Sequence, residues 1–152
     1  MHQKLLLHLL LHSGKLLEER IKRALRPYGI HQGQARILNA LNCYGERSQI
    51  EIARGLHIER ATATIMLQKL ETAGLIKRTA HDRDGRVIVV SLTPKGKKAA
   101  EKVDAVWQEI EEKLLATLGD LPRDTMEDAL LTIRNAFGGK SPAFKITKEE
   151  GQ

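Results

Sequence analysis

Residues 48–93 read SQIEIARGLHIERATATIMLQKLETAGLIKRTAHDRDGRVIVVSLT, and most of the fold can be inferred from this segment. Ser48 is followed three residues later by Glu51, a pair that forms a capping box at a helix start. A second helix is predicted from Glu59 to Ala73, and Gly74 is placed to end it in a left-handed conformation. The segment therefore begins as two helices joined by a turn.

The helix predicted from Glu59 to Ala73 has two different faces. Its inward face has the spacing i, i+3, i+4, i+7, which is met by Ala63, Met66, Leu67 and Leu70. Its outward face has short side chains near the start and no acid after Glu59, so it suits a DNA major groove about 12 Å wide. The residues of that face are Arg60, Ala61, Thr62, Thr64, Ile65, Gln68 and Lys69.

Two β-branched stretches, 75–80 and 87–92, predict the strands of a two-stranded hairpin, with Asp84-Gly85 as the turn between them. Arg83 and Arg86 make its tip basic, and arginine is favoured in the narrow minor groove. Together with Lys77 and Arg78 they could also be a solvated charge cluster. The neighbouring helix pair favours contact with DNA.

Long amphipathic helices are predicted before and after this segment. One spans residues 3–26 and stops at Pro27, a second spans 31–43, and a third starts after Thr93 with Pro94 in its first turn. The run LLLHLLL at 5–11 is too apolar for a helix in water, which favours packing on a second subunit over covering its own core. The expected dimer contacts are Leu6, Leu10, Leu17, Leu118, Met126, Leu130, Ile133 and Phe137.

Composition narrows the class of protein. The chain has 152 residues, enough for one domain with its own core, and a single cysteine, which excludes an internal disulfide and suits a cytoplasmic protein. Net charge is +5 over residues 1–47, +5 over 48–99 and −5 over 100–138, so the basic charge is concentrated in the first two thirds. The apolar run at 5–11 is much shorter than the roughly 20 residues of a membrane span.

Three motifs carry a resemblance to the multiple antibiotic resistance regulator (MarR) family, over about residues 5–137. Residues 50–53, IEIA, stand where the family has its first motif helix, and 70–78, LETAGLIKR, resemble its helix end and first wing strand. The third motif is the most specific, because both its residues and their spacing match. It comprises Asp84, Gly85 and Arg86 followed by Val89, Ser91, Leu92, Thr93 and Gly96.

This resemblance implies a mainly α protein with a small β-wing, a winged helix-turn-helix that forms a homodimer through N- and C-terminal helices. It implies one domain over residues 1–138, with a DNA-binding lobe at 30–93, dimerisation helices at 1–27 and 94–138, and a flexible tail at 139–152. Ser48 and Gln49 then meet phosphate, Arg86 enters the minor groove, and Asp84 orients the wing.

The same resemblance implies the partners. They are a pseudo-palindromic double-stranded operator, a second copy of the chain, and a small phenolic or apolar effector that releases or retunes binding. We expect a repressor with no cofactor and no metal. In this family the position of Ile65 often holds arginine or another polar residue, so one phosphate contact is missing, although a thymine methyl would accept the isoleucine.

Other classes are weighed against this interpretation. Cys43 would make a redox sensor, although a lone helical cysteine is usually a small buried hydrophobe. His8 and His12, spaced i, i+4, would make a metal sensor, but no carboxylate is near them before Glu18. An enzyme is disfavoured by the lack of a Ser-His-Asp order, a phosphate loop or an HExxH motif. A winged-helix adaptor that does not bind DNA stays open.

Overall fold

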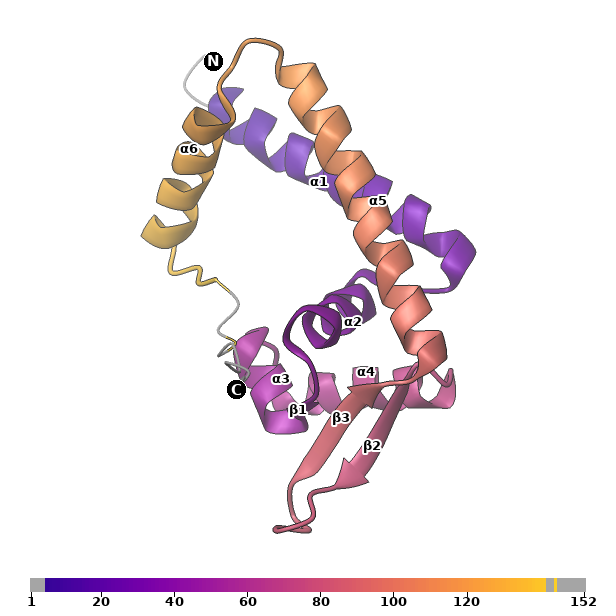
Figure 1. Ribbon diagram of the computed structural model, residues 1–152. Coiled ribbons are helices and arrows are strands. Elements are labelled where there is room, and N and C mark those ends of the chain that lie inside the picture. The colour runs from indigo at the N-terminus through magenta and orange to yellow at the C-terminus, as the bar shows by residue number, and fades with distance from the viewer. Residues whose placement is uncertain (1–4, 142–143, 145–152) are drawn as a thin grey trace, which may run out of the picture.

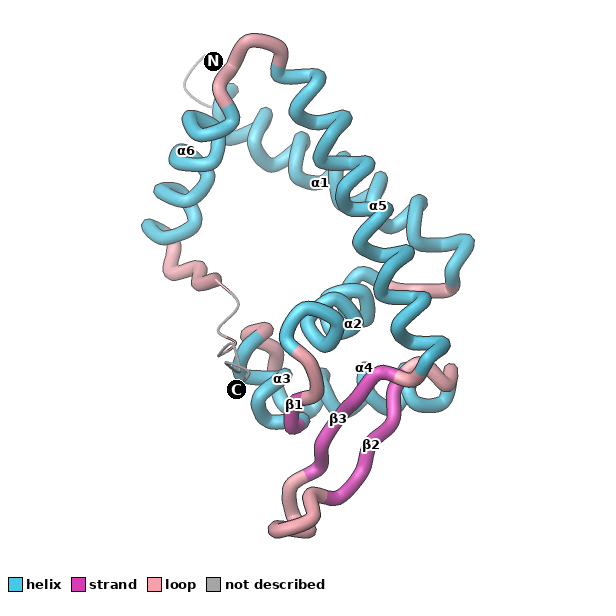
Figure 2. Tube along the Cα trace, in the orientation of Figure 1, coloured by secondary structure: helices cyan, strands magenta, loops and turns pink. Residues whose placement is uncertain are grey.

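The computed structural model describes residues 5–141 and residue 144, and it has the helical architecture shown in Figures 1 and 2. The helices are α1 (Leu5–Leu25), the short 3-10 helix η2 (Arg26–Tyr28), α2 (Gln32–Tyr44), α3 (Gln49–Gly55), α4 (Arg60–Thr72), α5 (Pro94–Leu118) and α6 (Arg123–Ala136). The strands are β1 (Arg47–Ser48), β2 (Ile76–Ala80) and β3 (Ile88–Leu92). The prediction of a mainly helical winged helix-turn-helix is confirmed.

The wing is a three-stranded antiparallel sheet in the order β1-β3-β2. Ile76 pairs with Leu92 and Ala80 with Ile88, so β2 and β3 form the predicted hairpin. The expectation of only two strands is wrong, because Arg47 pairs with Val90 and Ser48 with Val89. Two residues are too few to show the alternation that marks a strand, and β1 exists only because β3 lies beside it.

Local hydrogen bonds set the helix ends where the sequence places them. The Glu51 N–H donates to Ser48 Oγ at 3.1 Å, and the Ser48 N–H donates to the Glu51 carboxylate at 2.8 Å, completing the predicted capping box of α3. Gly74 has φ +72°, the left-handed value expected after α4. At α5 the Gly96 N–H donates to Thr93 Oγ1 at 3.0 Å. These three ends are predicted correctly.

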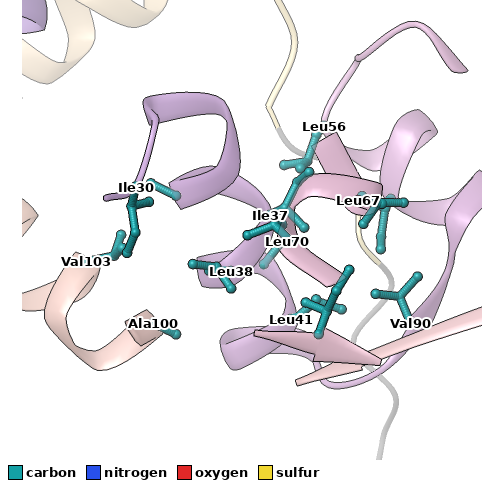
Figure 3. Packing of buried hydrophobic residues seen from close by; sticks show 14 of the residues in the cluster. Ile30, Ile37, Leu38, Leu41, Leu56, Leu67, Leu70, Val90, Ala100 and Val103 are labelled. Atoms are coloured by element: carbon teal, nitrogen blue, oxygen red, sulfur yellow. The ribbon is translucent and has the colours of Figure 1, made fainter. Parts of the chain in front are cut away.

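A hydrophobic core lies where α2, α3, α4, the sheet and the first half of α5 meet (Figure 3). Ile37 and Leu38 of α2 and Leu67 and Leu70 of α4 are almost completely buried, and Val90 closes the core from the sheet side. Ala100 and Val103 bring α5 into the same cluster. The inward face predicted for α4 is confirmed, with Met66 partly buried at its edge.

The junction between the wing and α5 requires glycine. A Cβ on Gly96 would lie 1.7 Å from the carbonyl oxygen of Leu75, so no other residue fits without moving the backbone. The Thr93 hydroxyl also donates to the Gly74 carbonyl at 2.6 Å, and the Thr93 N–H donates to the Leu75 carbonyl at 3.1 Å. These contacts attach the long α5 firmly to the sheet.

The opposite end of the molecule, formed by α1, the far half of α5 and α6, is built differently (Figure 1). In α6, all of which is described, no residue is buried, and in α1 only Leu25 is. Leu6 is 79% exposed and Phe137 is 88% exposed. The apolar faces of these helices therefore lack a covering element within the described part of the subunit.

Two details differ from what the sequence indicates. Cys43 is exposed on α2, so the expectation that it is a buried hydrophobe is wrong. On α2, Cys43 lies at the edge of the buried apolar face, where a small side chain can point either toward the core or toward solvent. The tail predicted at 139–152 lies largely outside the described residues, but Phe144 is partly buried against the core.

Candidate nucleic-acid interface

The outward face of α4 is free for a ligand. All seven residues assigned to it are exposed: Arg60, Ala61, Thr62, Thr64, Ile65, Gln68 and Lys69. Ile65 is 55% exposed, and an isoleucine that contributes nothing to the core is suited to contact a partner. The Thr64 hydroxyl donates back to the Arg60 carbonyl at 2.9 Å. As expected for a poor capping residue, Glu59 makes no side-chain cap at the helix start.

The start of α3 lies next to α4. Gln49 lines a small hollow of about 90 Å³ with Arg60 and Thr64, and Ile50, Ala53 and Ala63 complete its lining. Ser48 is partly buried and its hydroxyl is committed to the cap of α3. The structure therefore brings Gln49, which follows Ser48 in the chain, together with the beginning of α4, more than ten residues further on.

A hydrogen-bonded network connects the wing to both helices. The Arg78 guanidinium on β2 donates to the Glu71 carboxylate of α4 at 2.6 and 2.9 Å, and to Gln49 Oε1 of α3 at 3.1 Å. Both guanidinium N–H groups donate to the same carboxylate oxygen, Oε2, and these hydrogen bonds hold the pKa of Glu71 below its usual value against the opposing effect of burial. Arg78 is a brace inside the lobe, so grouping it with the exposed cations of the wing was wrong.

Asp84 fixes the backbone at the tip of the wing through hydrogen bonds. The Arg86 N–H donates to Asp84 Oδ1 at 3.0 Å, and the Val87 N–H donates to the Asp84 carbonyl at 3.0 Å. The Arg83 N–H donates to His81 Nδ1 at 3.2 Å. With the backbone turned this way, the side chains of Arg83 and Arg86 are both exposed at the tip. Figure 1 shows the hairpin projecting beyond the helices, away from α1 and α6.

A polar contact that sequence reasoning missed joins the lobe to α5. Asp104 of α5 accepts hydrogen bonds from the side-chain amides of Asn39 and Asn42 on α2. These residues are over 60 positions apart, and only the i, i+3 spacing of the two asparagines hinted at a shared role. The contact lies beside the apolar packing of α2 on α5 and fixes how the lobe is set on that helix.

Neither a metal-ligand cluster nor a membrane-spanning helix is found in the described ranges, 5–141 and 144. Over these residues, no three histidine, cysteine, aspartate or glutamate side chains lie together as metal ligands would. Among the helices described there, none is both long and apolar enough to cross a membrane.

Comparison with known proteins places the chain among bacterial regulators. A sequence model of the MarR family matches residues 30–88. YwoH of Bacillus subtilis, an uncharacterized HTH-type transcriptional regulator, is 30% identical over 76% of this chain and 83% of its own length. The HTH-type transcriptional repressor Rv2887 of Mycobacterium tuberculosis is 30% identical over 73% of this chain and 80% of its own.

Solved structures agree on the fold. The S. aureus MepR–DNA complex superimposes with a TM-score of 0.78 at 23% identity, covering 85% of this chain and 96% of MepR. Bordetella bronchiseptica BpsR, whose DNA binding is regulated by 6-hydroxynicotinic acid, has a TM-score of 0.73 at 20% identity, covering 88% of this chain and 93% of BpsR. The motif resemblance is thus confirmed, and this chain is a member of the MarR family of transcriptional regulators.

Proposed function

We propose that this protein is a homodimeric repressor that binds a pseudo-palindromic DNA operator and releases or retunes it when a small phenolic or apolar effector binds. One observation carries the DNA-binding proposal. The exposed, acid-free face of α4 and the arginine-tipped wing lie at one end of the molecule, and the uncovered apolar helices lie at the other.

Each part of the lobe has a role in this proposal. The outward residues of α4 read base edges in the major groove, with Ile65 against a thymine methyl. Arg86 and Arg83 enter the adjacent minor groove, where negative potential is concentrated. Ser48 and Gln49 hold phosphate at the start of α3. The MepR complex, which contains DNA, supports this arrangement by fold alone.

The dimer proposal rests on the exposed apolar faces of the helices at the far end of the molecule. Residues 30–93 form the DNA-binding lobe, and residues 1–27 and 94–138 form the helices that pair the two subunits. A hollow of about 460 Å³ lies between α5 and α6, and Leu118, Met126 and Leu130 are among its apolar lining residues. The exposed leucines of α1, Leu6 and Leu10 among them, have matching chemistry in a second copy. Pairing in this way sets two α4 helices on half-sites about one turn, roughly 34 Å, apart.

The effector proposal rests on a second hollow. It has a volume of about 660 Å³ between α1 and α5, and Leu16, Leu17 and Leu114 give it apolar walls. Arg20 and Lys113 stand among those leucines. Lys113 is paired with Glu109 at 2.8 Å, so Arg20 is the cation that would neutralise the carboxylate or phenolate of an aromatic acid. The compound that regulates BpsR belongs to this chemical class.

The DNA proposal is tested by selecting bound sequences from random duplexes and then measuring binding to the selected duplex by gel shift. The affinity for the selected duplex should fall steeply as salt rises, because phosphate contacts release counterions. A scrambled duplex of the same length is the control. An adaptor that does not use DNA would select no sequence and shift neither duplex at any salt concentration.

The effector proposal is tested separately by adding 6-hydroxynicotinic acid, as a probe of the aromatic acid class, to the assembled complex. We expect release or weakened binding from the wild-type protein and a smaller response from Arg20→Ala. An identical response from the two proteins would place the effector site elsewhere.

A further inference from the structure

The chain beyond α6 returns to the DNA-binding lobe and packs on it at an aromatic contact. The ring of Phe144 stacks on the ring of Tyr44, at the end of α2, with centroids 5.0 Å apart and planes 23° from parallel. Phe144 also occupies the space in front of Gly55, at the end of α3. A Cβ added to Gly55 would lie 2.5 Å from a Phe144 ring carbon. Tyr44 and Gly55 together form a seat for this ring.

A second contact lies three residues earlier in the chain. His57 Nε2 is 2.9 Å from the carbonyl oxygen of Ser141, which can only accept, so the imidazole donates. His57 lies in the turn between α3 and α4 and has φ +55°, a left-handed conformation that non-glycine residues seldom adopt. The returning chain therefore meets the turn of the helix-turn-helix itself.

We infer that the contacts of Ser141 and Phe144 act as a strap that fastens α6 to the DNA-binding lobe of the same subunit and thereby holds the recognition helix in a position suited to the operator. This inference rests on the proposed DNA-binding function and adds a control point to it. Along the chain, α6 is joined to the lobe through α5, which lies on the opposite side of the molecule in Figure 1.

The physical argument is one of restraint. Without the strap, the lobe is joined to α6 through the length of α5, and it shifts relative to α6 when that long helix bends, so that α4 spends part of its time away from the binding position. The apparent operator affinity is the intrinsic affinity multiplied by the fraction of time that α4 spends in the binding position. A strap made at Tyr44, Gly55 and His57 removes that freedom, since it fixes the far side of α2 and α3 to α6.

Two substitutions break the strap from opposite sides. Phe144→Ala removes the ring and leaves the seat intact. Gly55→Ala fills the seat with one methyl group, which displaces the ring but favours helix in α3, since alanine is the better helix former. Phe144→Tyr keeps an aromatic ring and is the rescue variant. Lys140→Ala, an exposed change in the same part of the chain, is the matched control.

The restraint itself is measured within one subunit. A Cys43→Ser chain with spin labels on cysteines at Asp82 of the wing and Asp128 of α6 is mixed with excess unlabelled protein, so that only intramolecular distances are read. We expect one narrow distance distribution for the parent, Phe144→Tyr and Lys140→Ala. Phe144→Ala and Gly55→Ala should broaden it, and the double variant should be no broader than either single variant. Equal widths in all chains would overturn the inference.

The consequence for DNA is measured with the selected operator duplex. Loss of a stacked aromatic contact should weaken operator binding about 3- to 10-fold in Phe144→Ala and in Gly55→Ala, and no further when they are combined. Broadening without any loss of affinity would overturn the role in operator binding. If the parent binds no duplex while the distances behave as expected, the DNA proposal fails and the strap stands.

Discussion

The two ends of this molecule are built on opposite principles. The lobe around α2, α3 and α4 closes a core of large apolar side chains, with Ile37, Leu38 and Leu67 inaccessible to water. The helices at the other end leave equally apolar side chains uncovered, and Ile133 is still 39% exposed. The lobe satisfies its hydrophobic pattern within one chain, whereas the far helices carry the same kind of pattern without a partner.

This difference separates folding from assembly. A core closed within one subunit is stable at any concentration, but an apolar face that is covered only by a second copy gains its stability from association. In the proposed function, the exposed polar and basic residues of the lobe contact DNA, and the exposed leucines of the far helices contact a second copy. Substitutions at the two ends should therefore fail in different ways.

The largest effect is expected from Ile133→Asp on α6. A carboxylate at the subunit contact should yield monomers, and a single lobe should bind the operator about 10²- to 10⁴-fold more weakly, because the second half-site no longer adds to the first. Light scattering and gel shift measure the two results. Thr132→Asp, about 100° around α6 from Ile133, should remain a dimer. Dimers of Ile133→Asp would show that other helices pair the subunits.

A core substitution in the lobe should act within one subunit. Leu67→Ala leaves a cavity in a fully buried site and should lower the free energy of unfolding by about 2–5 kcal/mol, equally at low and high protein concentration. Leu6→Ala, at the exposed end of α1, should destabilise the protein by an amount that depends on concentration. Denaturant unfolding at two protein concentrations checks both expectations. If Leu67→Ala and Leu6→Ala depend on concentration in the same way, the lobe and the far helices do not differ in how they are stabilised.

Within the lobe, a substitution of the exposed Arg86 should change DNA binding but not stability, whereas a substitution in the Arg78–Glu71 pair should change stability. Arg86→Ala should weaken operator binding by about 1–3 kcal/mol and leave the dimer and its unfolding unchanged, because the side chain has no role in packing. Arg86→Lys should recover part of the loss. Isothermal titration with the selected operator measures the affinity. Wild-type affinity in Arg86→Ala would show that the wing tip does not touch DNA.

The smallest effect concerns the brace. Since Arg78 lowers the pKa of Glu71 from its ordinary value of 4.5, the ionised carboxylate stabilises the fold above that pH, and this contribution is lost as pH falls through the lowered pKa. Glu71→Gln should be slightly less stable near pH 7, and its deficit should vanish in acid. Urea unfolding across this range, with Glu101→Gln as control, tests the sign. A deficit that persists in acid would exclude linkage to this carboxylate.

Much of the local structure was readable from the residues. The capping pair Ser48 and Glu51, the left-handed Gly74, and the spacing of Ala63, Leu67 and Leu70 all act over a few positions, so their meaning does not depend on distant parts of the chain. The exposed face of α4 and the order around Asp84 follow from the same short-range rules. Prediction succeeded here because neighbouring residues determine these features.

The features that the sequence analysis predicted wrongly depend instead on distant parts of the chain. β1 needs β3, about 40 residues away, and Arg78 needs Glu71 and Gln49 on two other helices. Cys43 is exposed because of how α2 packs, which its own residue type does not reveal. Each of these outcomes depends on which elements lie side by side.

Residue order therefore established the helix-turn-helix, the wing and the apolar helices, because periodicity and capping are local physics. Only the folded chain shows that Asn39 and Asn42 meet Asp104, or that Phe144 returns to Tyr44 across 100 positions. Such contacts form when packing of the core has already brought their elements together. No pattern within either segment encodes its distant partner.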